Sequence, residues 1–231
     1  EKGSKEVRFS AITVLGRVGD RSCVEPLLKI AKQSGDLQTA VRASLVANPD
    51  SAVDQEILQR LPGASDDKLL LLELVGLRQV QATEELIKSL DDSDGAVRAA
   101  ALQALGETVS QERIDVLINQ VLKPTKSEDS GAAARALRTA AVRMPDRDAC
   151  AILLGDAMNN ASTDKKLTLL ETVAVVGGPK SLTILAESAK KGDESLRDAS
   201  TRLLGEWMTI DVAPVLLDLA STGPADRFQV R

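Results

Sequence analysis

A period of 30 residues constrains this chain more than any other feature of its sequence. Four apolar residues follow one another at that spacing: Leu27, Ile57, Ile87 and Leu117. All of them except Ile57 stand eleven residues after a glycine that ends an apolar run. Units repeated at a fixed period stack on one another, because none of them can bury its apolar face alone. The spacing therefore predicts an array of stacked repeats.

Each repeat has the pattern of two helices joined by a tight turn. In residues 93–123, Ser93-Asp94 offers side-chain oxygens for an N-cap, and apolar residues then recur at helical spacing up to Gly106. Hydrophobic residues make up 43% of the chain but aromatic residues only 1%, so the core must consist of small and aliphatic side chains. We predict an all-α fold, an α-α superhelix of about seven antiparallel helix pairs.

The period also sets the expected domain organisation. The fifth pair is longer than the others, with its apolar anchor near Leu153, because residues 123–131 widen a loop, and the period returns at Leu185. We expect a single domain over 1–231. Its seven helix pairs are predicted at 4–34, 36–62, 65–91, 93–123, 126–161, 162–191 and 193–222, and an eighth unit starts at 224–231. Because both ends interrupt this array, we expect the chain to be a fragment of a longer protein.

A second internal match supports the repeat independently. The segment Lys68-Leu69-x-Leu71-Leu72-Glu73-x-Val75 returns as Lys166-Leu167-x-Leu169-Leu170-Glu171-x-Val173, and the alignment continues without gaps to Ile87 and Leu185.

The residues of the first repeat carry a family resemblance. The segment Val7-Arg8-x5-Val14-Leu15-Gly16-x2-Gly19-Asp20-x3-Val24-x-Pro26-Leu27-Leu28 resembles the bacterial HEAT repeat of the phycobilisome-lyase-like (PBS lyase HEAT-like) subtype, and segments from Asp94 and Leu196 are similar to it. The resemblance implies a HEAT or armadillo-like solenoid. The chain departs from the pattern at Val46-Ala47-Asn48-Pro49-Asp50, which replaces the glycine turn in the second repeat, and in the long fifth repeat.

Composition excludes several classes of function. The chain has no histidine, which removes Ser-His and Cys-His nucleophile pairs and imidazole metal sites. A net charge of −5 disfavours binding to a phosphate backbone, and no apolar run reaches the length of a membrane span. Cys23 and Cys150 lack metal-ligand spacing, and we expect two buried free thiols. We predict no enzyme activity for this segment, no cofactor and no metal; the location is either cytoplasmic or, after removal of an export signal, periplasmic.

Several polar motifs have structural interpretations. We interpret the pairs Asp66-Asp67 and Asp91-Asp92 as helix caps, and Gly177-Gly178-Pro179-Lys180 as a turn between helices rather than a phosphate loop. Trp207 is expected in a core or inter-repeat position on a first helix. We also expect a set of Arg–Asp hydrogen bonds between neighbouring repeats, formed by Arg8, Asp20, Asp94, Arg98 and Arg197.

The surface that remains for function is the one formed by the second helices, which line the concave face of a HEAT array. Two rows of polar residues flank the apolar anchors there, and we predict a binding face made of Glu25, Lys29, Gln55, Gln59, Glu85, Lys88, Asp115 and Asn119. Ordinary solvation of an exposed face is the competing interpretation. The row suits a basic or polar protein segment, or another domain of the same polypeptide.

The sequence leaves several functions open. The first is a non-catalytic scaffold for protein–protein or interdomain interaction. The resemblance also allows a HEAT-type DNA glycosylase, a phycobilin lyase or chaperone subunit, or a regulatory appendage of an enzyme domain outside this segment. The net charge and the single tryptophan argue against the glycosylase, which needs a basic cleft with aromatic residues.

Overall fold

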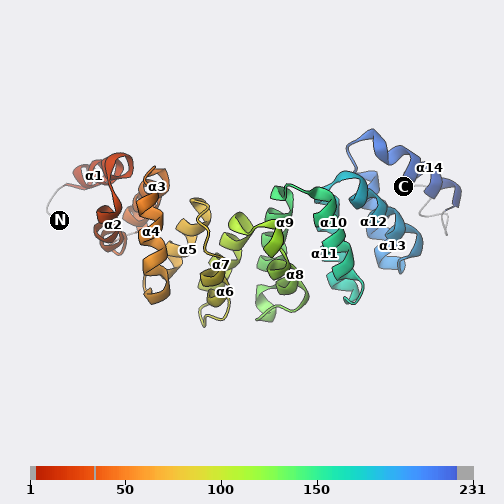
Figure 1. Cartoon of the computed structure of the whole chain (residues 1–231), viewed down its shortest axis with the longest axis horizontal. Helices are drawn as coiled ribbons and strands as arrows, with labels where there is room; N and C mark the ends of the chain where they lie inside the picture. The colour runs from red at the N-terminus through yellow and green to blue at the C-terminus, as the bar shows by residue number, and fades with distance from the viewer. Residues whose placement is uncertain (1–3, 34, 223–231) are drawn as a thin grey trace. The chain divides into compact units, whose positions relative to one another are not determined.

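The computed structural model describes residues 4–33 and 35–222, and these residues fold as α-helices with short 3₁₀ turns (Figure 1). Fourteen helices are present in the described ranges, one pair for each predicted repeat, so the predicted all-α superhelix is confirmed. The predicted start of an eighth unit, 224–231, lies outside the described residues.

The chain divides into two compact units, Glu1–Thr108 and Val109–Arg231. The boundary falls within the fourth predicted pair, which therefore contributes one helix to each unit. The first unit contains α1 (Lys5–Val18), η1 (Arg21–Cys23), α2 (Val24–Ala31), α3 (Gly35–Ala47), α4 (Ser51–Arg60), η2 (Leu61–Gly63), α5 (Lys68–Leu77), α6 (Thr83–Ser89) and α7 (Gly95–Thr108). The second unit contains η3 (Gln111–Arg113), α8 (Asp115–Leu122), η4 (Ser127–Asp129), α9 (Ser130–Arg143), α10 (Arg147–Met158), α11 (Thr163–Val176), α12 (Gly178–Lys191), α13 (Glu194–Gly205), η5 (Ile210–Val212) and α14 (Ala213–Thr222).

Within each unit the helices form two layers. In the first unit the first helices of successive pairs pack side by side, α1 on α3, α3 on α5 and α5 on α7, while α2 packs on α4. In the second unit α9, α11 and α13 pack in the same way, and the second helices α8, α10, α12 and α14 form the other layer. The core lies between the layers, and the predicted anchors Leu27, Ile57, Leu117 and Leu185 are fully buried in it.

Glycines allow the first helices to approach each other closely. A Cβ at Gly16 of α1 would lie 2.7 Å from the Ser44 carbonyl oxygen of α3, and one at Gly76 of α5 would lie 3.1 Å from the Ala104 Cα of α7. The Ser44 hydroxyl then donates to the Ile12 carbonyl at 2.7 Å across the first of these contacts. In the first and third repeats the glycine that ends the apolar run is therefore a packing residue.

Aspartates begin several helices. Asp50, Asp94, Asp146 and Asp193 each accept a hydrogen bond from a backbone N–H of the following turn, at 2.8 to 3.0 Å. Such caps satisfy backbone donors that have no partner within the helix. The predicted cap at Asp94 is confirmed, and the aspartates set where the repeats begin.

Candidate functional site

The predicted binding face lies on the second helices, and most of its residues are exposed. In the first unit Glu25 and Lys29 stand on α2, Gln55 and Gln59 on α4, and Lys88 on α6, all exposed. In the second unit Asp115 and Asn119 are exposed on α8. The face is thus described as two separate rows, one in each unit.

The predicted register is wrong by one residue in the third repeat. Leu86 is 0% exposed, whereas the predicted anchor Ile87 is only partly buried. Glu85 is accordingly half-buried, and its carbonyl accepts a hydrogen bond from the buried Ser89 hydroxyl at 3.0 Å. The exposed residues two places either side of the anchor are therefore Glu84 and Lys88, and Glu84 replaces Glu85 in the row.

The fifth repeat shows the same displacement. Leu154 of α10 is 0% exposed, but the predicted anchor Leu153 is 42% exposed. The long loop before α9 changes the spacing between the fourth and fifth repeats. A fixed period of 30 residues therefore cannot locate the buried anchor of the fifth repeat. Counting from Leu154 brings Ile152 and Asp156 to the surface, and the same offsets from Leu185 give the exposed residues Thr183 and Glu187 on α12.

In the first unit Glu25 is neutralised by cations of its own and of the next repeat. The Glu25 carboxylate lies 2.6 Å from Lys29 Nζ and 3.2 Å from Arg60 Nη2 of α4. Arg60 also pairs with Glu56, which in turn lies 3.4 Å from Arg21 of the first repeat. Hydrogen bonds from Lys29 and Arg60 lower the pKa of Glu25. Glu25 therefore joins α2 to α4 and offers little charge to a partner.

The corresponding carboxylates of the second unit are unpaired. Asp115, Asp156 and Glu187 have no hydrogen-bond or ion-pair partner for their side chains among the described residues, and all three are exposed. A carboxylate without a local partner keeps its capacity to accept charge-assisted hydrogen bonds from another molecule. The second-helix surface of this unit is the stronger candidate for binding.

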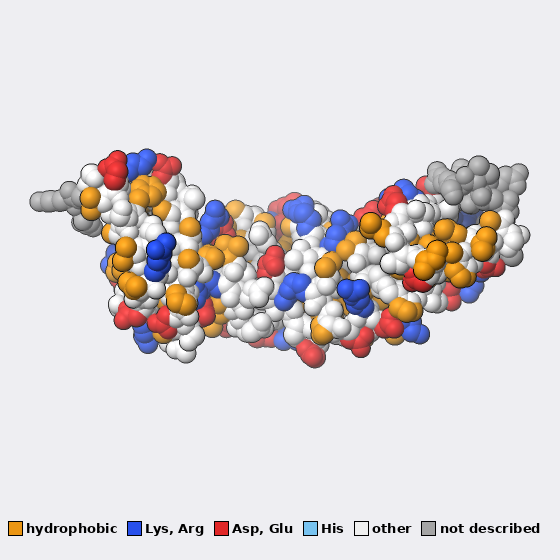
Figure 2. All heavy atoms as spheres, turned by 90° about the horizontal axis from the view of Figure 1, so that it is seen from above, with side chains coloured by type: hydrophobic (Ala, Val, Ile, Leu, Met, Phe, Trp, Pro, Cys, Tyr) orange, Lys and Arg blue, Asp and Glu red, His pale blue; other side chains and the backbone are white. Residues whose placement is uncertain are grey.

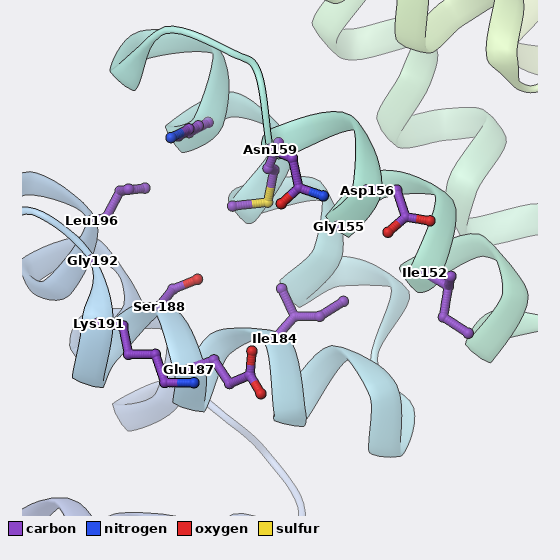
Figure 3. A pocket seen from close by; sticks show the side chains of 12 residues that line it. Ile152, Gly155, Asp156, Asn159, Ile184, Glu187, Ser188, Lys191, Gly192 and Leu196 are labelled. Carbon is purple, nitrogen blue, oxygen red and sulfur yellow. The ribbon is translucent and has the colours of Figure 1, made fainter.

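A cleft of about 420 Å³ lies between α10 and α12 in the second unit (Figure 3). Ile152 and Asp156 extend from α10 on one side, Glu187 and Lys191 extend from α12 on the other, and Ile184 lies between them. Gly155 makes room for Ile184, because a Cβ there would lie 3.0 Å from Ile184 Cδ1. We call this the α10–α12 cleft; it combines an apolar floor with charged edges of both signs.

The Arg–Asp hydrogen bonds between repeats remain a prediction, and the structure gives further contacts for the same residues. Arg8 donates to the Gln33 side chain, and Arg98 donates to the Asp92 and Ser93 carbonyls at 2.9 and 3.1 Å. Arg197 lies half-buried on α13. The two aspartates of that set act as caps: Asp94 begins α7, and Asp20 accepts from the Ser22 amide at 2.9 Å.

Other residues connect the repeats, and the internal match places two of them. Glu73 accepts from Arg42 of the preceding repeat at 3.2 Å, and its counterpart Glu171 accepts from Arg138 at 3.0 Å. The two glutamates occupy the same position of the matched segment, and each arginine comes from the preceding first helix. Their equivalence could have been read from the sequence match.

Arg78 is a structural residue that the sequence analysis missed. It follows α5, its side chain is 6% exposed, and it pairs with Asp54 at 2.5 Å while donating to the carbonyls of Leu45 and Asn48. These groups belong to the turn that lacks the usual glycine. The only signal in the sequence was the missing glycine at Val46-Ala47-Asn48-Pro49-Asp50, because without it this turn needs another group to hold its backbone.

The structure corrects the predictions for two of the remaining motifs. Asp67 stands at the N-cap position of α5 but makes no side-chain hydrogen bond to the helix. The carboxylates of Asp66 and Asp67 instead lie 3.5 and 3.3 Å from Lys32 Nζ of the first repeat. Trp207 lies in the loop after α13, where its indole N–H donates to Thr209 Oγ1 at 2.8 Å. The predicted turn at Gly177-Gly178 is present with positive φ at both glycines, and the Asp148 carboxylate accepts from the Lys180 amide at 3.3 Å. A carboxylate therefore already occupies the start of α12.

The chemistry of the buried thiols follows from their surroundings. Cys23 and Cys150 are both buried and free, as predicted. Burial raises the pKa of Cys150 to about 11, with a further contribution from Asp146, so the thiol is protonated and weakly nucleophilic at neutral pH. In residues 4–33 and 35–222 no group of three or more Cys, Asp or Glu side chains is placed to hold a metal ion. None of the helices described is both long enough and apolar enough to cross a membrane.

Comparison with known proteins identifies repeats in the first part of the chain. Residues 40–138 match the HEAT repeats family, and residues 7–33 match the PBS lyase HEAT-like repeat. No curated protein shows significant similarity to the chain. The two matches cover most of the first four helix pairs and most of α9.

Proposed function

Because the chain is a HEAT repeat protein, we propose that it is a non-catalytic scaffold that binds a segment of another protein, or of another domain of the same polypeptide, on its second-helix surface. Repeats of this kind commonly mediate protein interactions, since stacking creates an extended surface with residues at regular intervals. The proposal places the contact on the second unit rather than along the whole array.

The α10–α12 cleft is the observation that carries this proposal. Ile152 and Ile184 offer apolar surface that a partner can cover, and the exposed carboxylates of Asp156 and Glu187 stand on opposite sides of it. Lys166 and Lys191 also line the cleft, so it presents both signs of charge. A segment with an apolar side chain between polar neighbours matches this arrangement, because apolar contact supplies affinity and the charges fix orientation.

Charge reversal in the cleft tests the proposal. The full chain serves as bait in affinity capture, and the affinity of the captured partner is then measured for wild type and for Asp156→Lys/Glu187→Lys. We expect the double variant to weaken binding by about tenfold or more, because each reversal places a like charge against a partner group. Asp91→Lys/Asp164→Lys is the matched control, since it makes the same charge change at exposed carboxylates outside the cleft. Equal affinity of both double variants for the partner would refute the role of the cleft.

Duplex DNA is not the partner in this proposal. Asp115, Asp156 and Glu187 would repel a phosphate backbone, and Trp207 is held by hydrogen bonds in a loop. A gel-shift titration at low salt should give no tight binding. Salt-sensitive binding of the duplex would instead support the glycosylase alternative.

A further inference from the structure

A groove crosses the first helices of the first unit, in the layer opposite the second helices. It has a volume of about 430 Å³ and is lined from three consecutive first helices, α3, α5 and α7. The volume falls within the range of about 300–1,000 Å³ that is usual for ligand pockets. We call it the first-helix groove.

Small residues create the groove. Gly76 lets α7 approach α5, since a Cβ there would lie 3.1 Å from the Ala104 Cα. Ala43 on α3 and Ala100 on α7 line the groove with short side chains. The side chain of Leu77 projects at this point and is 51% exposed. The groove therefore has an apolar edge at Leu77 that remains accessible to another molecule.

The charges of the groove are unbalanced toward negative. Arg42 and Glu73 neutralise each other as an ion pair at 3.2 Å. Glu107, on α7, has no hydrogen-bond or ion-pair partner for its side chain in the described ranges, although it is half-buried. A half-buried carboxylate without a partner is incompletely hydrated, so a cation that approaches it gains more than at an open surface.

We propose that the first-helix groove docks a basic amphipathic segment of a partner protein, with an apolar side chain against Leu77 and a Lys or Arg beside Glu107. This site is distinct from the α10–α12 cleft and goes beyond the proposed function, because it gives the chain a second docking surface, formed by first helices of the other unit. The scaffold then holds two partner segments, one in each unit.

The form of the groove favours a polypeptide segment of this kind. Its lining comes from three parallel rows of side chains, so an amphipathic helix can contact them with apolar residues one turn apart. Leu77 at the edge is covered by such a segment, and burial of apolar surface drives the association. An acidic segment is disfavoured, since the one unpaired charge in the groove is a carboxylate.

Two synthetic peptides of about 15 residues test the proposal, a length at which helices become stable enough to form. Both carry Leu at helical spacing, and one has Lys where the other has Glu. Binding to the full chain is measured by fluorescence anisotropy. We expect the Lys peptide to bind about tenfold more tightly than the Glu peptide, and its affinity to fall as salt is added.

Variants locate the binding. Glu107→Lys should weaken the Lys peptide about tenfold, and Ala100→Leu should weaken it by filling the groove. Asp91→Lys is the matched control, because it reverses an exposed charge of the same unit outside the groove and should change the affinity less than twofold. If Ala100→Leu does not fold by circular dichroism, Leu77→Ser takes its place, since Leu77 is exposed and its replacement leaves no cavity.

The outcomes separate this proposal from the proposed function. Equal binding of the two peptides, or equal effects of Glu107→Lys and Asp91→Lys, would overturn the first-helix groove as a docking site. Asp156→Lys/Glu187→Lys should leave binding of the Lys peptide unchanged. If that double variant removes it and Glu107→Lys does not, the peptide occupies the α10–α12 cleft and the groove proposal fails while the proposed function stands.

Discussion

Removing the guanidinium of Arg78 should strongly destabilise the first unit. The turn between α3 and α4 lacks the glycine found in the first, third and fourth repeats and contains Asn48-Pro49-Asp50 instead. Arg78 supplies donors to this turn from the next repeat: Asn48 O at 2.7 Å, Asp50 O at 3.4 Å, Leu45 O, and the Asp54 carboxylate at 2.5 Å. Arg78→Met keeps the aliphatic stem and deletes all of these donors.

The magnitude follows from burial. The Arg78 side chain is 6% exposed, whereas its partner Asp54 is 29% exposed and can be rehydrated in part. Breaking a buried pair by removing one partner costs about 3–5 kcal/mol, and a hydrogen bond to a charged group contributes about 1.5–3 kcal/mol. Because these contributions are not additive and Asp54 regains water, we expect a loss of about 3 kcal/mol in the free energy of unfolding. Arg78→Lys keeps the charge but not the fork of donors, and should cost about half as much.

Urea titration followed by circular dichroism measures this loss, and hydrogen exchange locates it. Amide protection in residues 45–54 should fall in Arg78→Met before it falls elsewhere in the unit. Arg202→Met is the control, because Arg202 is 48% exposed and pairs with Glu206 only within one turn, so a change below about 0.5 kcal/mol is expected. A loss below about 1 kcal/mol for Arg78→Met, with unchanged exchange in residues 45–54, would contradict the role assigned to Arg78.

Three further predictions concern packing and protonation. Gly16→Ala should destabilise the fold by about 1–3 kcal/mol in thermal or urea unfolding, because its Cβ would meet the Ser44 carbonyl oxygen at 2.7 Å; Gly205→Ala, with nothing within 4 Å of its Cβ, should be neutral or stabilising by up to about 1 kcal/mol. Leu154→Ala should lower the free energy of unfolding by about 2–5 kcal/mol and Leu153→Ala by less than about 1 kcal/mol, since the first side chain is 0% and the second 42% exposed. The opposite order would support Leu153 as the anchor of the repeat. Cys150 should resist alkylation in the folded protein at pH 8, and because its folded pKa is raised from 9.0 to about 11, its contribution to stability should be complete below about pH 9 and lost as the pH rises toward 11; rapid alkylation of the native protein, followed by mass spectrometry, would contradict the burial.

The helix pairs could be predicted from the sequence because each repeat marks its own limits. An aspartate or serine begins several helices, an apolar row gives the inner face, and in the first and third repeats a glycine marks where the next first helix packs. The failures lie where a local signal was ambiguous by one residue. Leu153 and Leu154 are both leucines, and Leu86 and Ile87 are both aliphatic, so only three-dimensional packing decides which one enters the core. A helix turns by about 100° per residue, so this error moved the predicted site from Glu84 to Glu85.

Contacts between repeats were harder to predict because their partners lie about one period apart. The guanidinium of Arg78 reaches carbonyls in the preceding turn, and a carbonyl has no side chain whose type could indicate it. Hydrophobic side chains also gather on the surface near the end of the second unit (Figure 2). Between α13 and α14, Met208 and Ile210 are 98% and 88% exposed. Composition gave the amount of apolar surface but not where it would remain uncovered.

The use of charge between repeats explains why the two proposed sites lie where they do. Glu25, Glu73 and Glu171 each hold a basic residue of a neighbouring repeat, so they stabilise the stack and have little left to offer a partner. Glu107, Asp156 and Glu187 have no such bond among the described residues, and each stands beside small or apolar side chains that lower the local polarity. The same residue type therefore serves cohesion or recognition according to whether the adjacent repeat provides a cation. A lysine placed near Glu187, one turn before it by Thr183→Lys or across the cleft by Asp156→Lys, should pair with the Glu187 carboxylate. Such a variant should be slightly more stable than the wild type and should bind the partner more weakly.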